Sequence, residues 1–119
     1  MTRINAAIKP QELPSKLLLA ELREIKRIPN TIHKASLEGI PEEFNLGPGH
    51  VKFFYDKGAY TLSRYLDLRA EAIERGYNVQ DFSEAWHKYP PELMNHWRPG
   101  KRERDIIIER IKERGFDLI

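Results

Sequence analysis

The sequence predicts an all-α fold in which a single compact domain, residues 1–119, contains three main helices joined by irregular loops. Three observations lead to this prediction. Apolar residues recur every three or four positions in three stretches, and prolines and glycines separate those stretches. The single β-prone run, Phe53-Phe54-Tyr55, has no visible partner strand, so we expect no sheet of more than two short strands. At 119 residues the chain is long enough for one hydrophobic core.

The first helix is predicted over residues 14–37. Pro14 suits its first turn, Pro29 is expected to kink it, and Gly39 is expected to stop it. At about 100° per residue, the helix has an apolar face and an opposite, largely basic face. The apolar face contains Leu17, Leu18, Leu22, Ile25, Ile28 and Ile32, and the opposite face contains Lys16, Ala20, Arg23, Arg27, Asn30 and Lys34.

Two glutamates of this helix depart from the pattern. Glu24 lies at the border between the basic and apolar faces, within one turn of Arg27, whereas Glu21 projects from the apolar face itself. A buried carboxylate needs a partner. We therefore expect Glu21 to be a structural residue paired with Arg69 or His50.

The middle of the chain is predicted to be a loop followed by a second helix. Residues 40–49 are rich in proline, glycine and glutamate and indicate a loop. The aromatic run after it is expected to pack beside or within the start of the second helix, which stops at Gly76. A histidine beside a glycine turn, such as His50, is expected to be structural. The inward face of this helix is predicted from Leu62, Tyr65, Leu66, Arg69, Ala72 and Ile73.

The last part of the chain contains an irregular connection and a third helix. Residues 78–100 carry tryptophans beside prolines, which are expected to cover the core, although aromatic side chains in a loop can also stack on exposed bases. The third helix is predicted over residues 101–114, with Ile107, Ile108 and Ile111 facing inward. We expect the first and last helices to lie side by side.

Composition excludes several kinds of protein. The chain has no cysteine, so it forms neither disulfides nor thiolate zinc sites. Its histidines are scattered, and neither an apolar run of membrane-spanning length nor a signal peptide is visible. The net charge of +2 is unevenly distributed: residues 1–34 carry net +4, residues 35–97 net −4 and residues 98–119 net +2. If the two basic ends meet, their charges form one patch able to follow a phosphate backbone.

Three blocks of sequence carry a resemblance to a known family. They are MTRIN followed by AELREIKR, then LGPGHVKFFYDKGAY with IERGYNVQDF, and more weakly WRPGKRERDIIIERIKER. Together they resemble the pyrimidine-dimer DNA glycosylase/AP lyase family over most of the chain. The resemblance implies a DNA repair enzyme that breaks an N-glycosidic bond and then nicks the strand through a Schiff base and β-elimination. It implies no metal and no cofactor.

The resemblance also implies the catalytic residues. The nucleophile is the α-amino group of Thr2, exposed by removal of Met1, and Glu24 matches the acid/base glutamate. An amine must be unprotonated to attack a sugar. An α-amino group, with a pKa near 7.7 to 8.0, is closer to that state at neutral pH than a lysine near 10.4. Arg3 and Arg23 would lower the pKa of the amine further.

The implied partner is double-stranded damaged DNA, held in a kinked form with an extruded nucleotide. Arg3, Arg23, Arg27 and Arg110 match positions that bind phosphates or the lesion, and Arg114 stands where the family usually has lysine. Two departures leave the lesion open between a cyclobutane dimer, another damaged base and an abasic site. The loop at residues 40–49 is acidic where the family has a longer basic one, and GFDLI replaces an aromatic, basic tail.

Two other functions remain open from the sequence. One is a non-catalytic helical DNA-binding module of the same fold, and the other is a small helical interaction protein. For the enzyme we expect a monomer in the cytoplasm, with no membrane partner.

Overall fold

The computed structural model describes residues 4–32 and 37–119, and these residues form helices and irregular connections. The α-helices are α1 (Ser15–Ile25), α2 (Ile28–Thr31), α3 (Gly58–Glu74) and α4 (Lys101–Glu113), and the 3-10 turns are η1 (Pro10–Glu12), η2 (Lys52–Phe54), η3 (Ser83–Lys88) and η4 (Pro91–Leu93). In the described part of the chain, β-pairing is limited to an isolated bridge between Lys57 and Met94. The prediction of an all-α fold with three main helices is confirmed.

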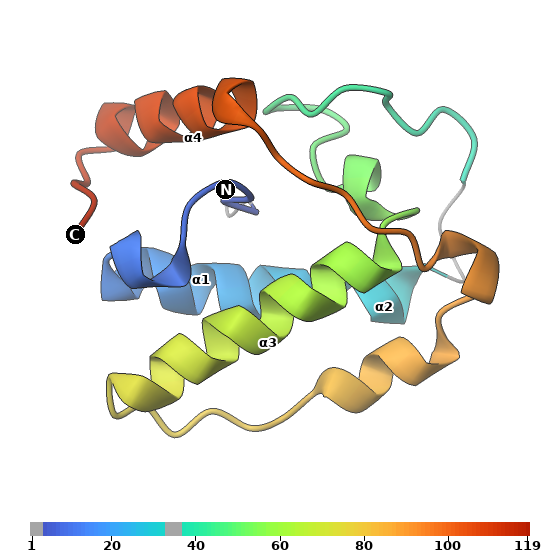
Figure 1. Ribbon diagram of the computed structural model, residues 1–119, viewed down its shortest axis with the longest axis horizontal. Helices are drawn as coiled ribbons and strands as arrows, with labels where there is room; N and C mark the ends of the chain where they lie inside the picture. Colours follow the sequence, from blue (N-terminus) through green and yellow to red (C-terminus); the bar gives the residue numbers. More distant parts are fainter. Residues whose placement is uncertain (1–3, 33–36) are drawn as a thin grey trace.

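The centre of the fold is the packing of α1 against α3, which lie side by side in Figure 1. The buried side chains of both helices recur at three- and four-residue spacing, as an amphipathic helix requires. The large apolar ones are Leu18, Leu22 and Ile25 from α1, and Tyr65 and Leu68 from α3, with the smaller Ala72 one turn after Leu68.

The first helix is shorter than predicted. It ends at Ile25, and the chain turns through Lys26 and Arg27 before α2 begins, so the break comes before Pro29 rather than as a kink at it. Proline has no amide hydrogen to donate to the carbonyl of Ile25, four residues earlier, which disfavours a continuous helix. Instead Pro29 occupies the first turn of α2, where that donor is not needed. Leu37 is not helical, and residues 33–36 lie outside the described residues.

The inward face of α3 also differs from the prediction. Leu66 and Ile73 are 45% and 47% exposed, whereas Thr61 and Arg64 are buried. Thr61, Arg64, Leu68 and Ala72 follow one another at three- or four-residue spacing, so they share a face. Arg64 was not among the residues predicted to face inward, and charged groups are rarely buried unless they are paired.

An aromatic cluster fills the space between the start of α3 and the irregular connection at residues 78–100. Trp97 stacks on Phe44 with ring centroids 5.8 Å apart and contacts Phe53 edge to face at 5.0 Å. Trp86 is also buried, and its indole N–H donates to the Thr61 hydroxyl at 3.0 Å. The tryptophans of this connection therefore cover the core, as predicted.

Helix α4 has nearly the predicted bounds, with Ile107 and Ile111 buried and Ile108 half-buried. The expectation that this helix lies side by side with α1 is wrong, because α4 does not pack directly along α1. The segment at residues 4–9 lies between α4 and the α1–α3 pair (Figure 1), and the Arg104 guanidinium donates to both carboxylate oxygens of Glu12 at 2.8 and 2.9 Å. The end of α4 faces α1 across a cavity.

Candidate active site

The segment at residues 4–9 has irregular backbone, yet it is mostly buried. Ile4 and Ile8 are fully buried and Asn5 is 4% exposed. Buried backbone N–H and C=O groups need hydrogen-bond partners. Within the segment the Ile8 N–H donates to the Asn5 carbonyl at 3.1 Å, and most of the other partners are side chains from distant parts of the chain.

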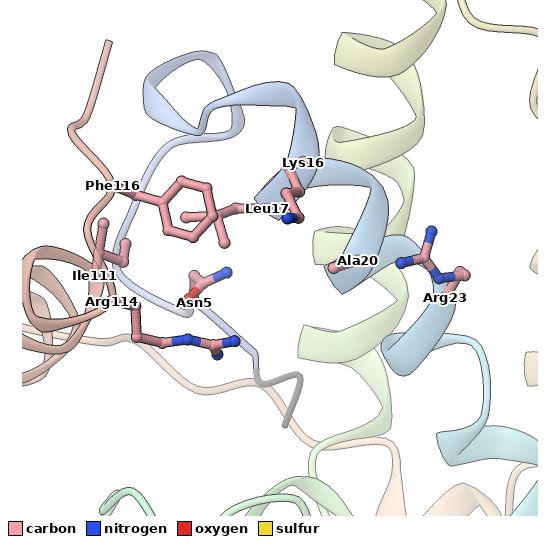
Figure 2. A pocket seen from close by; sticks show the side chains of 8 residues that line it. All are labelled: Asn5, Lys16, Leu17, Ala20, Arg23, Ile111, Arg114 and Phe116. Carbon is pink, nitrogen blue, oxygen red and sulfur yellow. The ribbon is translucent and has the colours of Figure 1, made fainter.

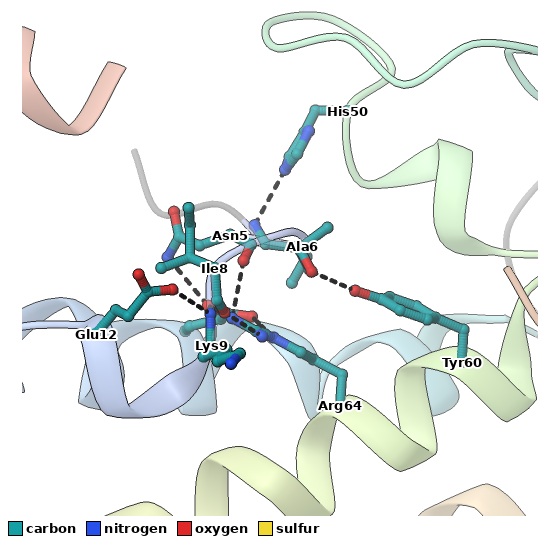
Figure 3. Close-up of polar contacts among 10 residues, drawn as sticks. Asn5, Ala6, Ile8, Lys9, Glu12, His50, Tyr60 and Arg64 are labelled. Carbon is teal, nitrogen blue, oxygen red and sulfur yellow. Dashed lines mark hydrogen bonds and ion pairs between the residues drawn. The ribbon is translucent and has the colours of Figure 1, made fainter. Parts of the chain in front are cut away.

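Arg64, on the inward face of α3, is the centre of these contacts (Figure 3). Its Nε and Nη2 donate to the two oxygens of Glu21 at 2.8 and 3.0 Å, and Nη2 and Nη1 also donate to the carbonyls of Asn5 and Ile8. The amide of Asn5 donates to Glu21 as well, at 3.0 Å. Burial disfavours the guanidinium charge, but the attraction of the Glu21 carboxylate outweighs it and raises the pKa of Arg64.

This cluster corrects one prediction and confirms another. Glu21 is fully buried, as its place on the apolar face indicated, but its partner is Arg64 rather than Arg69 or His50. Arg69 instead donates to the carbonyl of Val79 at 3.3 Å. The spacing of Arg64 with Leu68 and Thr61 was the signal in the sequence that could have placed it inside.

Two further side chains hold the same segment. The Ile4 N–H donates to Nε2 of His50 at 3.0 Å, and the Tyr60 hydroxyl donates to the Ala6 carbonyl at 2.8 Å. Burial raises the pKa of Tyr60, which keeps its hydroxyl protonated as a donor. His50 is thus structural, as its position beside a glycine turn indicated. Figure 3 shows these contacts converging on residues 4–9 from α1, from α3 and from the loop before η2.

A cavity of about 440 Å³ opens beside this segment, between the outer face of α1 and the end of α4. Figure 2 shows side chains from both helices, and Asn5, bordering the space. The lining is mixed: Leu17, Ala20, Ile111 and Phe116 are apolar, and Asn5, Lys16, Arg23 and Arg114 are polar or basic. With three cations and no carboxylate among these residues, the cavity favours an anionic ligand. Its volume lies in the range of ligand pockets.

The structure brings together some of the predicted site residues and separates others. Arg23 and Arg114 line the cavity, on opposite sides of it. Glu24 is half-buried on α1, next in sequence to Arg23, and its Oε2 lies 3.6 Å from Nη1 of Arg27, whose side chain is 72% exposed. Arg110 is not among the cavity-lining residues, and it forms an ion pair with Glu113 at 3.3 Å.

Some predicted residues cannot be placed, and others were missed. Thr2 and Arg3 lie outside the described residues. Lys16 and Asn5 line the cavity but were not predicted as site residues. Lys16 lies seven residues before Arg23, two helical turns away on the same face, so the helical spacing could have identified it.

Neither a metal site nor a membrane-spanning helix is found among the described residues. No group of three or more histidine, aspartate or glutamate side chains in that part of the chain is arranged to hold a metal ion. None of the described helices combines the length and the apolar character that crossing a membrane requires.

A match to a known protein family identifies the family of this chain. A model of the family described as pyrimidine dimer DNA glycosylase matches residues 1–85. The chain belongs to the pyrimidine dimer DNA glycosylase family. This is a family of DNA repair glycosylases, and its substrate is DNA. The match covers α1, α3 and the whole cluster around Arg64, whereas α4 with Arg110 and Arg114 lies outside it.

Proposed function

We propose that this family member is a DNA glycosylase with AP lyase activity, which acts as a monomer on pyrimidine dimers or related damaged or abasic sites in double-stranded DNA. The α-amino group of Thr2 is the nucleophile, and Glu24 is the acid/base group. The observation that carries the proposal is the anchoring of residues 4–8 beside a basic cavity that Arg23, the neighbour of Glu24, also lines.

Sequence position and basicity support the choice of nucleophile. Thr2 precedes the buried, anchored Ile4 by two residues in the sequence. An α-amino group has an ordinary pKa near 7.7 to 8.0, and a sizeable fraction of it is therefore neutral at neutral pH. A lysine side chain, with an ordinary pKa near 10.4, is almost entirely charged under the same conditions.

The chemistry needs one amine and one proton-transfer group. The neutral amine attacks the sugar C1′, the N-glycosidic bond breaks and the base leaves with its electron pair. Loss of the amine proton and opening of the sugar ring, with a proton delivered to O4′, give an imine. Removal of a C2′ proton then expels the 3′ phosphate by β-elimination, and water hydrolyses the imine. Glu24 carries the protons to O4′ and from C2′, a role typically worth about 10² to 10⁴ in rate.

The basic residues bind the DNA in this proposal. Arg23 and Arg114 hold phosphates at the cavity, Arg27 and Arg110 hold phosphates along the adjoining surface, and Arg3 contributes beside the amine. Lys16 extends the same set. A sugar carbon inside a duplex is inaccessible to an amine, so the damaged nucleotide must be extruded from a kinked duplex.

Borohydride trapping tests the proposal, because only an imine is reduced to a stable protein–DNA bond. The protein, with Met1 removal verified by intact mass, is incubated with duplexes that contain a cyclobutane dimer or an abasic site. We expect an adduct that maps to the Thr2 nitrogen. Glu24→Gln should abolish strand cleavage but preserve binding, whereas Glu92→Gln, a change at an exposed glutamate of η4, should leave both unchanged. Duplex binding without an adduct would favour a DNA-binding module instead, and the absence of both would favour a helical interaction protein.

A further inference from the structure

The contact between His50 and Ile4 fixes the chemical state of the histidine. A backbone N–H can only donate, so Nε2, 3.0 Å from the Ile4 nitrogen, must be the acceptor. A carbonyl can only accept, so Nδ1, 3.1 Å from the Asn45 carbonyl oxygen, must carry the proton. The imidazole is therefore neutral and held as a single tautomer.

The ring is also fixed in orientation. His50 is 5% exposed, and its ring packs edge to face against Phe44 and Phe54, with centroids 5.2 and 5.7 Å apart. The two phenylalanine rings themselves meet at 6.1 Å. Because the neighbours of the imidazole are rigid aromatic groups, the acceptor nitrogen has a defined position relative to the core.

We infer that His50 is a positioning residue for the N-terminal amine. The inference rests on the proposed function. Glu21, Arg64 and Tyr60 hold Asn5, Ala6 and Ile8, and the His50 contact anchors Ile4, which follows Thr2 by two residues in the sequence. Without it the chain can rotate at Ile4 while everything after Asn5 stays in place. A displacement of about 1 Å at a reacting group can cost on the order of 10²-fold in rate.

Two substitutions separate the two hydrogen bonds of the imidazole. The amide of glutamine can place an oxygen near the position of Nε2, so His50→Gln retains an acceptor for the Ile4 N–H. The shorter asparagine places its amide near Nδ1, so His50→Asn retains the donor to Asn45 and loses the Ile4 contact. Tyr89→Phe serves as a control, because it removes a partly buried hydrogen bond outside residues 4–9, which the Tyr89 hydroxyl donates to the Tyr55 carbonyl at 2.6 Å.

The experiment measures three quantities on each full-length variant: the single-turnover rate of borohydride-trapped adduct on an abasic duplex, the affinity for that duplex, and hydrogen exchange at the Ile4 amide. We expect His50→Asn to lower the trapping rate by roughly 10- to 100-fold, to raise Ile4 exchange and to leave the affinity within about twofold. His50→Gln should recover most of the rate and the protection, and Tyr89→Phe should match the wild type in rate.

The remaining outcomes would contradict either the role of His50 or the proposed function on which it rests. If His50→Asn raises Ile4 exchange but traps DNA at the wild-type rate, His50 holds the segment without positioning the amine, and the inference is wrong. If His50→Gln fails as badly as His50→Asn, or if Tyr89→Phe lowers the rate equally, the effect is one of general stability and the inference is again wrong. If the wild-type protein traps no DNA, the proposed function fails first, and this inference fails with it.

Discussion

Replacing Arg64 with methionine should strongly destabilise the fold, even though methionine can fill much of the space of the arginine stem. The change leaves Glu21 fully buried without its cationic partner, and removal of one member of a buried pair typically costs about 3 to 5 kcal/mol. It also removes the donors to the Asn5 and Ile8 carbonyls. The Asn5 carbonyl keeps the Ile8 N–H as a donor, but the Ile8 carbonyl is left unpaired, which costs about 1 to 3 kcal/mol when water cannot reach it. Since water can reach part of the opened site, we expect a loss of about 4 kcal/mol.

That loss is large for a chain of this size. At 0.05 to 0.15 kcal/mol per residue, a chain of 119 residues has a free energy of unfolding of roughly 6 to 18 kcal/mol. Arg64→Lys should lose less than Arg64→Met, because an ammonium group can still reach Glu21. It cannot, however, reproduce a fork that donates to the carboxylate and to two carbonyls at once.

Urea unfolding followed by circular dichroism measures these differences. Arg69→Met is the matched control on the same helix: Arg69 is half-buried, with a 3.3 Å hydrogen bond to the Val79 carbonyl, and its loss leaves no buried carboxylate behind. We expect Arg69→Met to cost under about 1 kcal/mol. In the double variant Glu21→Gln/Arg64→Met the cost should be less than the sum of the two single costs, because the unpaired charge is gone. Equal losses for Arg64→Met and Arg69→Met would refute the central role given to Arg64.

Two further predictions concern DNA binding and pH. Arg23→Ala, Arg27→Ala and Arg110→Ala should each weaken duplex binding without unfolding the protein. Each lost phosphate contact should reduce the slope of the logarithm of the binding constant against the logarithm of salt concentration by about one. If all three variants bind as the wild type does, these arginines do not form the DNA-binding surface. The Arg104 hydrogen bonds lower the pKa of Glu12 from 4.5 to about 2, so this pair stabilises the fold above about pH 4.5 and loses its contribution as the pH falls towards 2. Because the pair is partly open to water, we expect the free energy of unfolding to fall by about 1 kcal/mol over this pH range. The measurement compares the acid sensitivity of the wild type with that of Glu12→Gln, which lacks the pair. If the two proteins are equally sensitive to acid, the pair does not make this contribution.

The sequence was sufficient for the helices because their signals are local. The three- and four-residue spacing of Leu18, Leu22 and Ile25 defines α1 without knowledge of the rest of the chain. The break after Ile25 was placed too late, because the effect of Pro29 falls on the carbonyl four residues earlier and not on the proline itself. Leu66 and Ile73 were assigned inward because apolar residues on a helix are expected to be buried, but the buried face includes Arg64 instead.

The candidate site was less predictable, because its contacts join residues far apart in the sequence. Glu21 and Arg64 are 43 positions apart, and His50 is 46 positions from Ile4. Spacing along one helix could indicate that Glu21 needs a partner but not which cation reaches it. The resemblance supplied Thr2, Arg3 and Glu24 as site residues, and their roles stay predictions. The cavity added Lys16, which its helical spacing with Arg23 could have indicated, and Asn5, which only the meeting of α1, α4 and the first segment could show.

Helix α3 carries two polar side chains, Arg64 and Tyr60, that point into the protein, and the segment that they contact explains why. Residues 4–9 form neither a helix nor a strand, so burial would leave the carbonyls of Ala6 and Ile8 without donors and the Asn5 carbonyl with the Ile8 N–H alone. Arg64 and Tyr60 provide those donors from α3. A hydrophobic residue at position 64 would suit α3 alone, but it would leave the first segment unsatisfied. An irregular segment can be buried only if side chains from the surrounding helices satisfy its backbone groups, which accounts for a charged pair in the core of a small protein.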